Sequence, residues 1–105
     1  MHATLERYEG VDRERTDELT KKVNDTLVPR LSELPGFNGY YLIEAGNGVM
    51  SSVSLFDTSA QADESTRVAG EWIGEQELEA ALPKPPKITS GPVIARKTGR
   101  LVAAV

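Results

Sequence analysis

Few side chains in this sequence are of the types and spacings that perform chemistry. Glu71, Glu75 and Glu79 repeat every four residues and so share one face of a helix, where carboxylates could bind a metal ion. No histidine lies near them, and a charged stripe of this kind is typical of a solvated helix face, which is the interpretation we favour. The one histidine, His2, could act as a base, but its place at the start of the chain argues against that role. We therefore expect no metal site.

Two further patterns have plain structural interpretations. Ser51, Ser52 and Ser54 lie in an apolar stretch that lacks the sharp turn needed to present a nucleophilic serine. The Gly-Asn-Gly sequence at residues 46–48 resembles part of a phosphate-binding loop, but neither another glycine nor a helix follows it. An Asn-Gly pair between two apolar runs favours a type I′ turn, because both central residues of that turn need positive φ. This pattern predicts a hairpin that joins strands at residues 37–44 and 49–56.

Several other side chains allow both a functional and a packing role. Tyr40 and Tyr41 point to opposite faces of the predicted strand, and either phenol could transfer protons or simply pack. Trp72 is the only tryptophan; its usual role is packing, but its N–H needs a partner that a ligand could supply. Arg7 is either an edge or interface charge, or a buried cation facing a cavity. Asn38 would need hydrogen-bond partners if it were buried.

Composition excludes several classes of protein. The formal net charge is −4 over 105 residues, which argues against a nucleic-acid partner, since such binding relies on Lys and Arg neutralising phosphates. The absence of cysteine excludes disulfides, thiolate metal sites and a cysteine nucleophile. Charged residues within the first ten positions leave no signal-peptide core, and no apolar run approaches the roughly 20 residues of a membrane helix. We expect a cytoplasmic protein that binds neither nucleic acid nor membranes.

Two helices are expected to position these residues. The first follows a capping residue, Asp12, and should be kinked or divided at Pro29, which cannot donate a backbone hydrogen bond. Its apolar stripe consists of Leu19, Val23, Leu27, Leu31 and Leu34. The second begins with Thr58 and Gln61 at capping-box spacing and should continue until Pro83 stops it. Its expected buried face comprises Ala62, Ala69, Trp72, Ile73, Leu78 and Leu82.

Strands are expected at residues 2–9 and 87–97 in addition to the hairpin, and Pro92 indicates that the last of them is either an edge strand or bulged at that residue. The two hairpin strands carry apolar residues on both faces. One face of the first should carry Phe37, Gly39, Tyr41 and Ile43, and one face of the next Val49, Ser51, Val53 and Leu55. A sheet with one solvated face would alternate more cleanly. We therefore predict that the chain's own helices cover one face and a second copy covers the other.

The element order β-α-β-β-α-β defines a ferredoxin-like α+β sandwich, with a four-stranded antiparallel sheet and two helices on one face. Several motifs within residues 3–97 support a family resemblance: Tyr8-Glu9-Gly10, Val28-Pro29-Arg30-Leu31, Leu34-Pro35-Gly36-Phe37 followed by Gly39-Tyr40-Tyr41, Ser54-Leu55-Phe56-Asp57, and Trp72. Together they resemble the dimeric α/β-barrel superfamily, and within it the antibiotic-biosynthesis-monooxygenase-like group. We predict one ferredoxin-like domain over residues 1–97, a C-terminal tail over 98–105, and a homodimer that forms the barrel.

The resemblance implies a cofactor-independent monooxygenase that acts on a small aromatic or enolisable substrate. Relatives place an asparagine, a tryptophan and a basic or phenolic side chain around a cavity between sheet and helices. Carried over to this sequence, these implied catalytic residues are Trp72, Tyr41, Asn38 and Arg7, with Asn24 and Tyr40 as further candidates and no cofactor-binding residue. Haem-degrading relatives use a histidine on the second helix, and this chain has none there.

Two other functions fit the same scaffold, because a fold does not fix an activity. One is a non-catalytic dimeric protein that binds a small molecule or takes part in a stress response. The other is an isomerase or decarboxylase that uses the same cavity for enolate chemistry. A pocket beside Trp72 with at least one buried polar group would favour catalysis, whereas a collapsed core there would favour the non-catalytic alternative.

Overall fold

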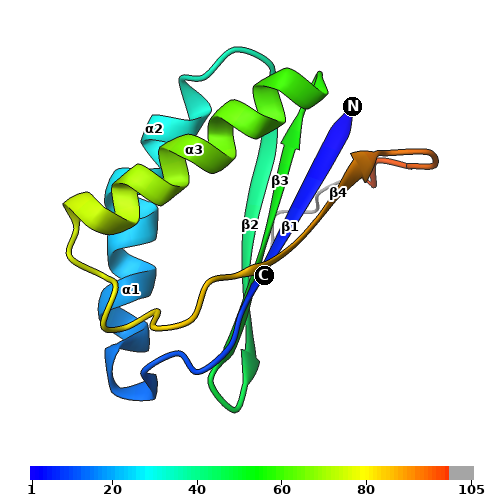
Figure 1. The fold of residues 1–105 in the computed structure, drawn as a ribbon. Coiled ribbons are helices and arrows are strands. Elements are labelled where there is room, and N and C mark those ends of the chain that lie inside the picture. Colours follow the sequence, from blue (N-terminus) through cyan, green and yellow to red (C-terminus); the bar gives the residue numbers. More distant parts are fainter. Residues whose placement is uncertain (100–105) are drawn as a thin grey trace.

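The computed structural model describes residues 1–99, which form a four-stranded antiparallel sheet with helices on one face (Figure 1). The strands, in the spatial order β2-β3-β1-β4, are β1 (His2–Tyr8), β2 (Phe37–Gly46), β3 (Val49–Phe56) and β4 (Lys87–Pro92). The helices are α1 (Thr16–Lys22), α2 (Val28–Ser32) and α3 (Ser59–Glu75). The predicted ferredoxin-like fold is confirmed. None of the helices within residues 1–99 has the length and apolar character needed to span a bilayer.

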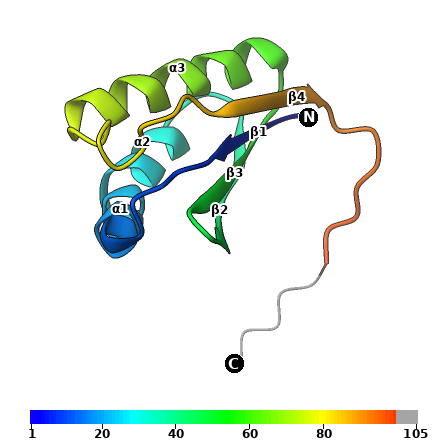
Figure 2. The same ribbon diagram turned by 60° about the horizontal axis from the view of Figure 1, so that its bottom comes forward.

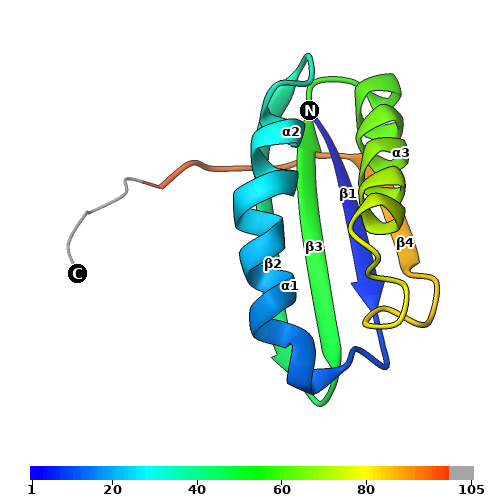
Figure 3. The same ribbon diagram turned by 90° about the vertical axis from the view of Figure 1, so that its left-hand side faces the viewer.

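The first helical segment is continuous in sequence but divided in geometry. A 3-10 turn (Arg13–Arg15) follows Asp12, whose side chain accepts a hydrogen bond from the Glu14 amide. A π-helical turn (Val23–Leu27) then separates α1 from α2. Pro29 lies in the first turn of α2, where its missing N–H costs least, so the predicted division at this proline is confirmed. The predicted apolar stripe faces the sheet, and Figure 3 shows α1 and α2 over β2, with α3 over β1.

Helix α3 starts as predicted but ends early. Thr58 and Gln61 form the expected capping box. The helix ends at Glu75 instead of continuing to Pro83, because Glu77 adopts a left-handed conformation with φ of 56°. The amides of Glu77 and Leu78 then donate to the carbonyls of Gly74 and Ile73, which is the Schellman arrangement of a helix C-terminus. Leu78 is nevertheless fully buried, so its predicted place in the core is confirmed.

The hairpin has the predicted turn and two unpredicted register shifts, one between Phe37 and Gly39 and one between Glu44 and Gly46. Asn47 and Gly48 both have positive φ, as a type I′ turn requires. A β-bulge at Asn38 places Phe37 opposite Phe56 and Gly39 opposite Leu55. The bulge reverses the side on which Phe37 lies, so it packs edge-on against Phe56 with ring centroids 5.7 Å apart. The prediction that Phe37 shares a face with Gly39 is therefore wrong.

Strand β4 is an edge strand, the first of the two alternatives predicted from Pro92, but it ends at Pro92 instead of reaching residue 97. Its partner β1 begins at His2, which lies opposite Pro92, so the ladder has no further residues to pair with. After a last hydrogen bond from the Val93 amide to the Met1 carbonyl, the chain leaves the sheet (Figure 2). Ile94 on this segment is 93% exposed. Most of the predicted tail, residues 100–105, lies outside the described residues.

The face of the sheet opposite the helices is uncovered in the single chain and has an apolar centre, with Arg7 and Lys87 in the row that contains Ile43. One row across it joins Tyr41, Val53, Leu5 and Thr89. Leu5 is 44% exposed and Tyr41 is 61% exposed, and Ile43 in the next row is exposed too. The side chains of Tyr40, Ser52 and Glu6 point the other way, toward the helices, because neighbouring residues of a strand alternate between faces.

Candidate functional site

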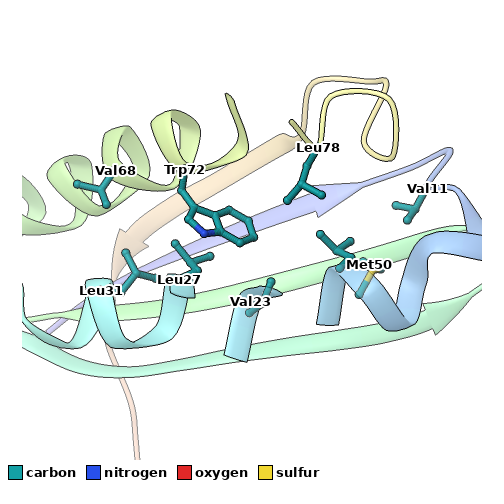
Figure 4. Packing of buried hydrophobic residues seen from close by; sticks show 9 residues of the cluster. Val11, Val23, Leu27, Leu31, Met50, Val68, Trp72 and Leu78 are labelled. Atoms are coloured by element: carbon teal, nitrogen blue, oxygen red, sulfur yellow. The ribbon is translucent and has the colours of Figure 1, made fainter. Parts of the chain in front are cut away.

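A small cavity lies between the helices and the sheet, beside Trp72. Apolar side chains from the helices form its upper wall, among them Leu19, Val23, Leu27, Leu31, Ala69, Trp72 and Ile73. Figure 4 shows the Trp72 indole reaching from α3 toward Leu27 and Val23 on the facing helical segment. The packing leaves about 40 Å³ of free space. That is room for roughly two or three water molecules, so a larger ligand requires the walls to move.

The floor of the cavity contains a buried carboxyl group. Glu6 of β1 is only 8% exposed, and its Oε2 atom accepts a hydrogen bond of 2.9 Å from the Tyr8 phenol. Burial raises the pKa of the Glu6 carboxyl above its ordinary value, an effect that the hydrogen bond from Tyr8 partly offsets. Burial and the neighbouring Glu6 carboxyl raise the pKa of Tyr8 as well, so its phenol keeps its proton. Such an environment is typical of a carboxyl group that exchanges protons.

Tyr40 and Ser52 extend this polar floor onto β2 and β3. Both line the cavity, and Ser52 lies directly between Glu6 and Leu42 in the register of the sheet. Burial raises the pKa of Tyr40 to about 12, and a hydrogen bond with Ser52 offsets part of that increase. Tyr40 therefore remains a neutral phenol at physiological pH. The floor consequently offers one carboxyl group and several hydroxyl groups beneath an apolar wall.

Trp72 links α3 to the π-helical turn. Its side chain is 3% exposed, and the indole Nε1–H donates a hydrogen bond of 2.7 Å to Oγ1 of Thr26. The Thr26 hydroxyl in turn donates to the Lys22 carbonyl over 2.7 Å. The indole N–H is thus satisfied by the protein itself, while the ring forms part of the cavity wall. The irregular turn that carries Thr26 is of a kind often found at functional sites.

A surface groove adjoins the cavity on the side of β2. It runs between the first helical segment and β2, has a volume of about 250 Å³, and shares Val23, Tyr40, Leu42 and Met50 with the cavity. Asn24 and Glu44 lie in the groove but not in the cavity. Because these side chains line both spaces, their rearrangement would open a route from the groove to the cavity that contains Glu6.

Of the four residues predicted to be catalytic, the structure places only Trp72 in the cavity wall. Arg7 and Tyr41 point to the open face of the sheet, where the Arg7 guanidinium lies 3.5 Å from Glu9. Asn38 is exposed at the β-bulge and donates to Asp57 over 2.8 Å. Among the alternatives, Tyr40 faces the cavity and Asn24 the adjoining groove.

Sequence reasoning missed Glu6 and Tyr8. The signal that could have found them is the period-two alternation of β1, in which Leu5 and Arg7 face one way and Glu6 and Tyr8 the other. The alternation separates the two faces of β1, but only the structure shows that the Glu6 face is the covered one, where Glu6 pairs with the buried Ser52. His2, which was set aside as a base, lies outside the cavity with its Nε2 atom 2.9 Å from the Ser90 hydroxyl. Residues 1–99 contain no cluster of three or more metal-ligating side chains.

Comparison with known proteins identifies the fold. No protein-family model and no curated protein sequence matches the chain. Solved structures of other proteins do match the chain. A monooxygenase from the gene ActVA-Orf6 of Streptomyces coelicolor, in complex with nanaomycin D, is 13% identical, with a TM-score of 0.69 over 94% of this chain and 92% of that one. A dimeric ferredoxin-like protein from an uncultured marine organism is 14% identical, with the same TM-score and coverage.

A protein of unknown function from Nitrosomonas europaea, NE2512, is 18% identical, with a TM-score of 0.69 over 94% of each chain. Another neighbour is described as an antibiotic biosynthesis monooxygenase. The structural neighbours thus include the group that the sequence motifs resemble, together with proteins of unknown function. At these identities the likeness establishes the fold and leaves the activity open.

Proposed function

We propose that this protein is a cofactor-independent monooxygenase that acts on a small aromatic or enolisable molecule bound between the helices and the sheet. The observation that carries the proposal is the buried Glu6 carboxyl beside Tyr8 in a cavity whose other walls are mainly apolar. A buried carboxyl group with a raised pKa can take a proton from a weakly acidic C–H or O–H group. A solved structure of the same fold is described as a monooxygenase, which supports the same activity.

The proposed reaction uses the substrate as its own reductant. Glu6 accepts a proton from an activated methylene or phenol, and the resulting carbanion or phenolate reacts with dioxygen. When a methylene group becomes a ketone, two C–H bonds break, one oxygen atom forms the new C=O bond, and the other leaves as water. All four electrons come from the substrate, so the reaction balances as CH₂ plus O₂ giving C=O plus H₂O. The neutral phenol of Tyr40, which lines the same cavity, can donate a hydrogen bond to the developing anion, whereas the Tyr8 proton is already donated to Glu6.

Within this proposal Trp72 forms the wall against which an aromatic ring stacks, and it holds the π-helical turn through Thr26. Arg7 and Tyr41 have a different role in this proposal. They lie on the apolar open face, which we propose is covered by a second copy of the chain. The exposed Leu5, Tyr41 and Ile43 support this arrangement, because a monomer would leave an apolar patch in water. A neighbour with the same fold is described as dimeric.

The activity is tested by recording oxygen uptake in air, without added metal or flavin, over a panel of phenols and anthrone-like substrates. We expect uptake that matches the ketone formed, and a loss of about 10²-fold or more in Glu6→Gln, since a general base contributes that much. Glu33→Gln, at an exposed position, is the matched control and should retain full activity. An absence of uptake across the panel would contradict the proposal and favour the non-catalytic binding protein.

A further inference from the structure

We infer that the cavity selects uncharged aromatic molecules that donate a hydrogen bond to Glu6, and that it rejects organic anions. This inference rests on the proposed function to the extent that it assigns the ligand to the same cavity. It also concerns binding alone, so it can be tested whether or not turnover occurs.

The charges around the cavity carry the inference. Glu6 is the only charged side chain among the described residues that line it. The other polar side chains are the hydroxyl groups of Tyr8, Tyr40, Ser52, Ser54, Ser65 and Thr66, and the indole of Trp72, whose N–H is bonded to Thr26. No lysine, arginine or histidine is among these lining residues, so a carboxylate, sulfonate or phosphate on a ligand would find no cation there.

The adjoining groove has the same character. Its lining, within residues 1–99, includes one charged side chain, Glu44, together with Thr20, Asn24 and apolar residues. An anion approaching by this route would pass one carboxylate and then meet another, without a compensating cation at either place. The formal net charge of −4 acts in the same direction at long range.

Charge repulsion disfavours an anionic ligand and desolvation disfavours a cationic one, so an uncharged ligand should bind best. An anion can sit beside Glu6 only if that carboxyl is protonated at the same time, because like charges in a buried site cannot both be ionised cheaply. An ammonium group would attract Glu6, but both charges must be stripped of water in a largely apolar cavity, which offsets the attraction. A neutral hydroxyl avoids both costs. A carboxylate oxygen can accept more than one hydrogen bond, so Glu6 can bind such a donor while it keeps its bond to Tyr8.

Three naphthalene derivatives of nearly equal size test the inference: 1-naphthalenemethanol, 1-naphthoate and 1-naphthalenemethylamine, all at neutral pH. Trp72 is the only tryptophan, so its indole N–H gives a single NMR signal that reports directly on the cavity. We expect the alcohol to shift this signal in a saturable way and to bind at least about tenfold more tightly than the naphthoate. The amine should also bind more weakly than the alcohol.

The variant Glu6→Gln should weaken binding of the alcohol and strengthen binding of the naphthoate, so that the two affinities become more nearly equal. Glu33→Gln removes one charge at an exposed position and should leave their ratio unchanged. Naphthoate binding as tightly as the alcohol, the amine binding tightest of the three, or no saturable shift with any of them would each overturn the inference. If the alcohol binds selectively but no oxygen is consumed, the proposed activity fails while the inference stands.

Discussion

The Tyr8 phenol donates a 2.9 Å hydrogen bond to Glu6, two residues earlier on the same strand. Both side chains point toward the helices, and both line the cavity. A carboxyl group held in this way has one fixed partner, a raised pKa and contact with the space where a ligand would bind.

Glu6→Gln should stabilise the protein increasingly as the pH rises. The pKa of Glu6 is raised in the folded protein from its ordinary value of 4.5, so the folded state holds this proton to higher pH than the unfolded state does. The contribution of Glu6 to the free energy of unfolding therefore falls as the pH rises from the pKa of Glu6 in the unfolded state to its higher pKa in the folded state. Glutamine does not titrate, so the variant does not lose this stability. Melting temperatures of both proteins from below pH 4.5 to neutral pH would show the difference growing. A constant difference, or the same trend in Glu33→Gln, would contradict the prediction.

Trp72→Phe and Thr26→Val should show strong energetic coupling. Thr26→Val leaves the partly buried indole N–H without its partner, at a cost of about 1 kcal/mol in the free energy of unfolding. In the Trp72→Phe background no indole N–H remains, so the same threonine change should cost much less. Urea unfolding of the two single variants and the double variant measures the coupling. Additive losses would mean that the hydrogen bond contributes nothing to stability.

Leu5→Lys should convert a dimer into a folded monomer. Leu5 lies in the middle of the apolar open face, and lysine there would bury a charge in the proposed interface while contacting only solvent in the monomer. Sedimentation velocity at micromolar concentration gives the oligomeric state, and circular dichroism checks the fold. Ala80→Lys, at an exposed position in the connection after α3, is the control and should remain dimeric. A monomeric parent protein at this concentration would rule out the proposed dimer.

Gly36→Ala should destabilise the protein more than Gly46→Ala does. Both glycines have positive φ, so alanine costs about 1–2 kcal/mol at either position from backbone strain alone. At Gly36 the new Cβ atom would also lie 1.9 Å from the Gln61 side chain, which forms the capping box of α3, whereas nothing lies within 4 Å at Gly46. Thermal unfolding should therefore show the larger decrease for Gly36→Ala. Equal decreases would show that Gln61 moves aside without loss.

Glu77→Gly should stabilise the protein by about 1 kcal/mol. Glu77 is a non-glycine residue in the left-handed conformation that ends α3, and glycine adopts this conformation without strain. Ala60→Gly, in the first turn of the same helix, serves as the comparison and should destabilise by about 0.5–1 kcal/mol. The free energy of unfolding in urea distinguishes the two outcomes. A loss of stability in Glu77→Gly would indicate that the glutamate side chain contributes more than its backbone strain costs.

The sequence by itself determined the elements and their order. The Asn47-Gly48 turn, the Thr58–Gln61 capping box, the division near Pro29 and the apolar stripe from Leu19 to Leu31 all depend on residues close together in the chain, so local stereochemistry was sufficient. The apolar open face followed from strand alternation. Element ends were less predictable: α3 ended at a left-handed glutamate, and β4 ended where its partner strand had no further residues.

Only the tertiary structure decided which polar residues share the cavity. Trp72 was predicted to lie there, but Tyr41, Arg7 and Asn38 were not brought to it, whereas Glu6 and Tyr8 were. Which side chains line the cavity depends on which face of the sheet the helices cover and on the bulge at Asn38. A shift of one residue in the strand register would exchange the two faces. The sequence shows that neighbouring strand residues face opposite ways. Packing of α1, α2 and α3 against one side then determines that Glu6 becomes buried while Arg7 stays exposed.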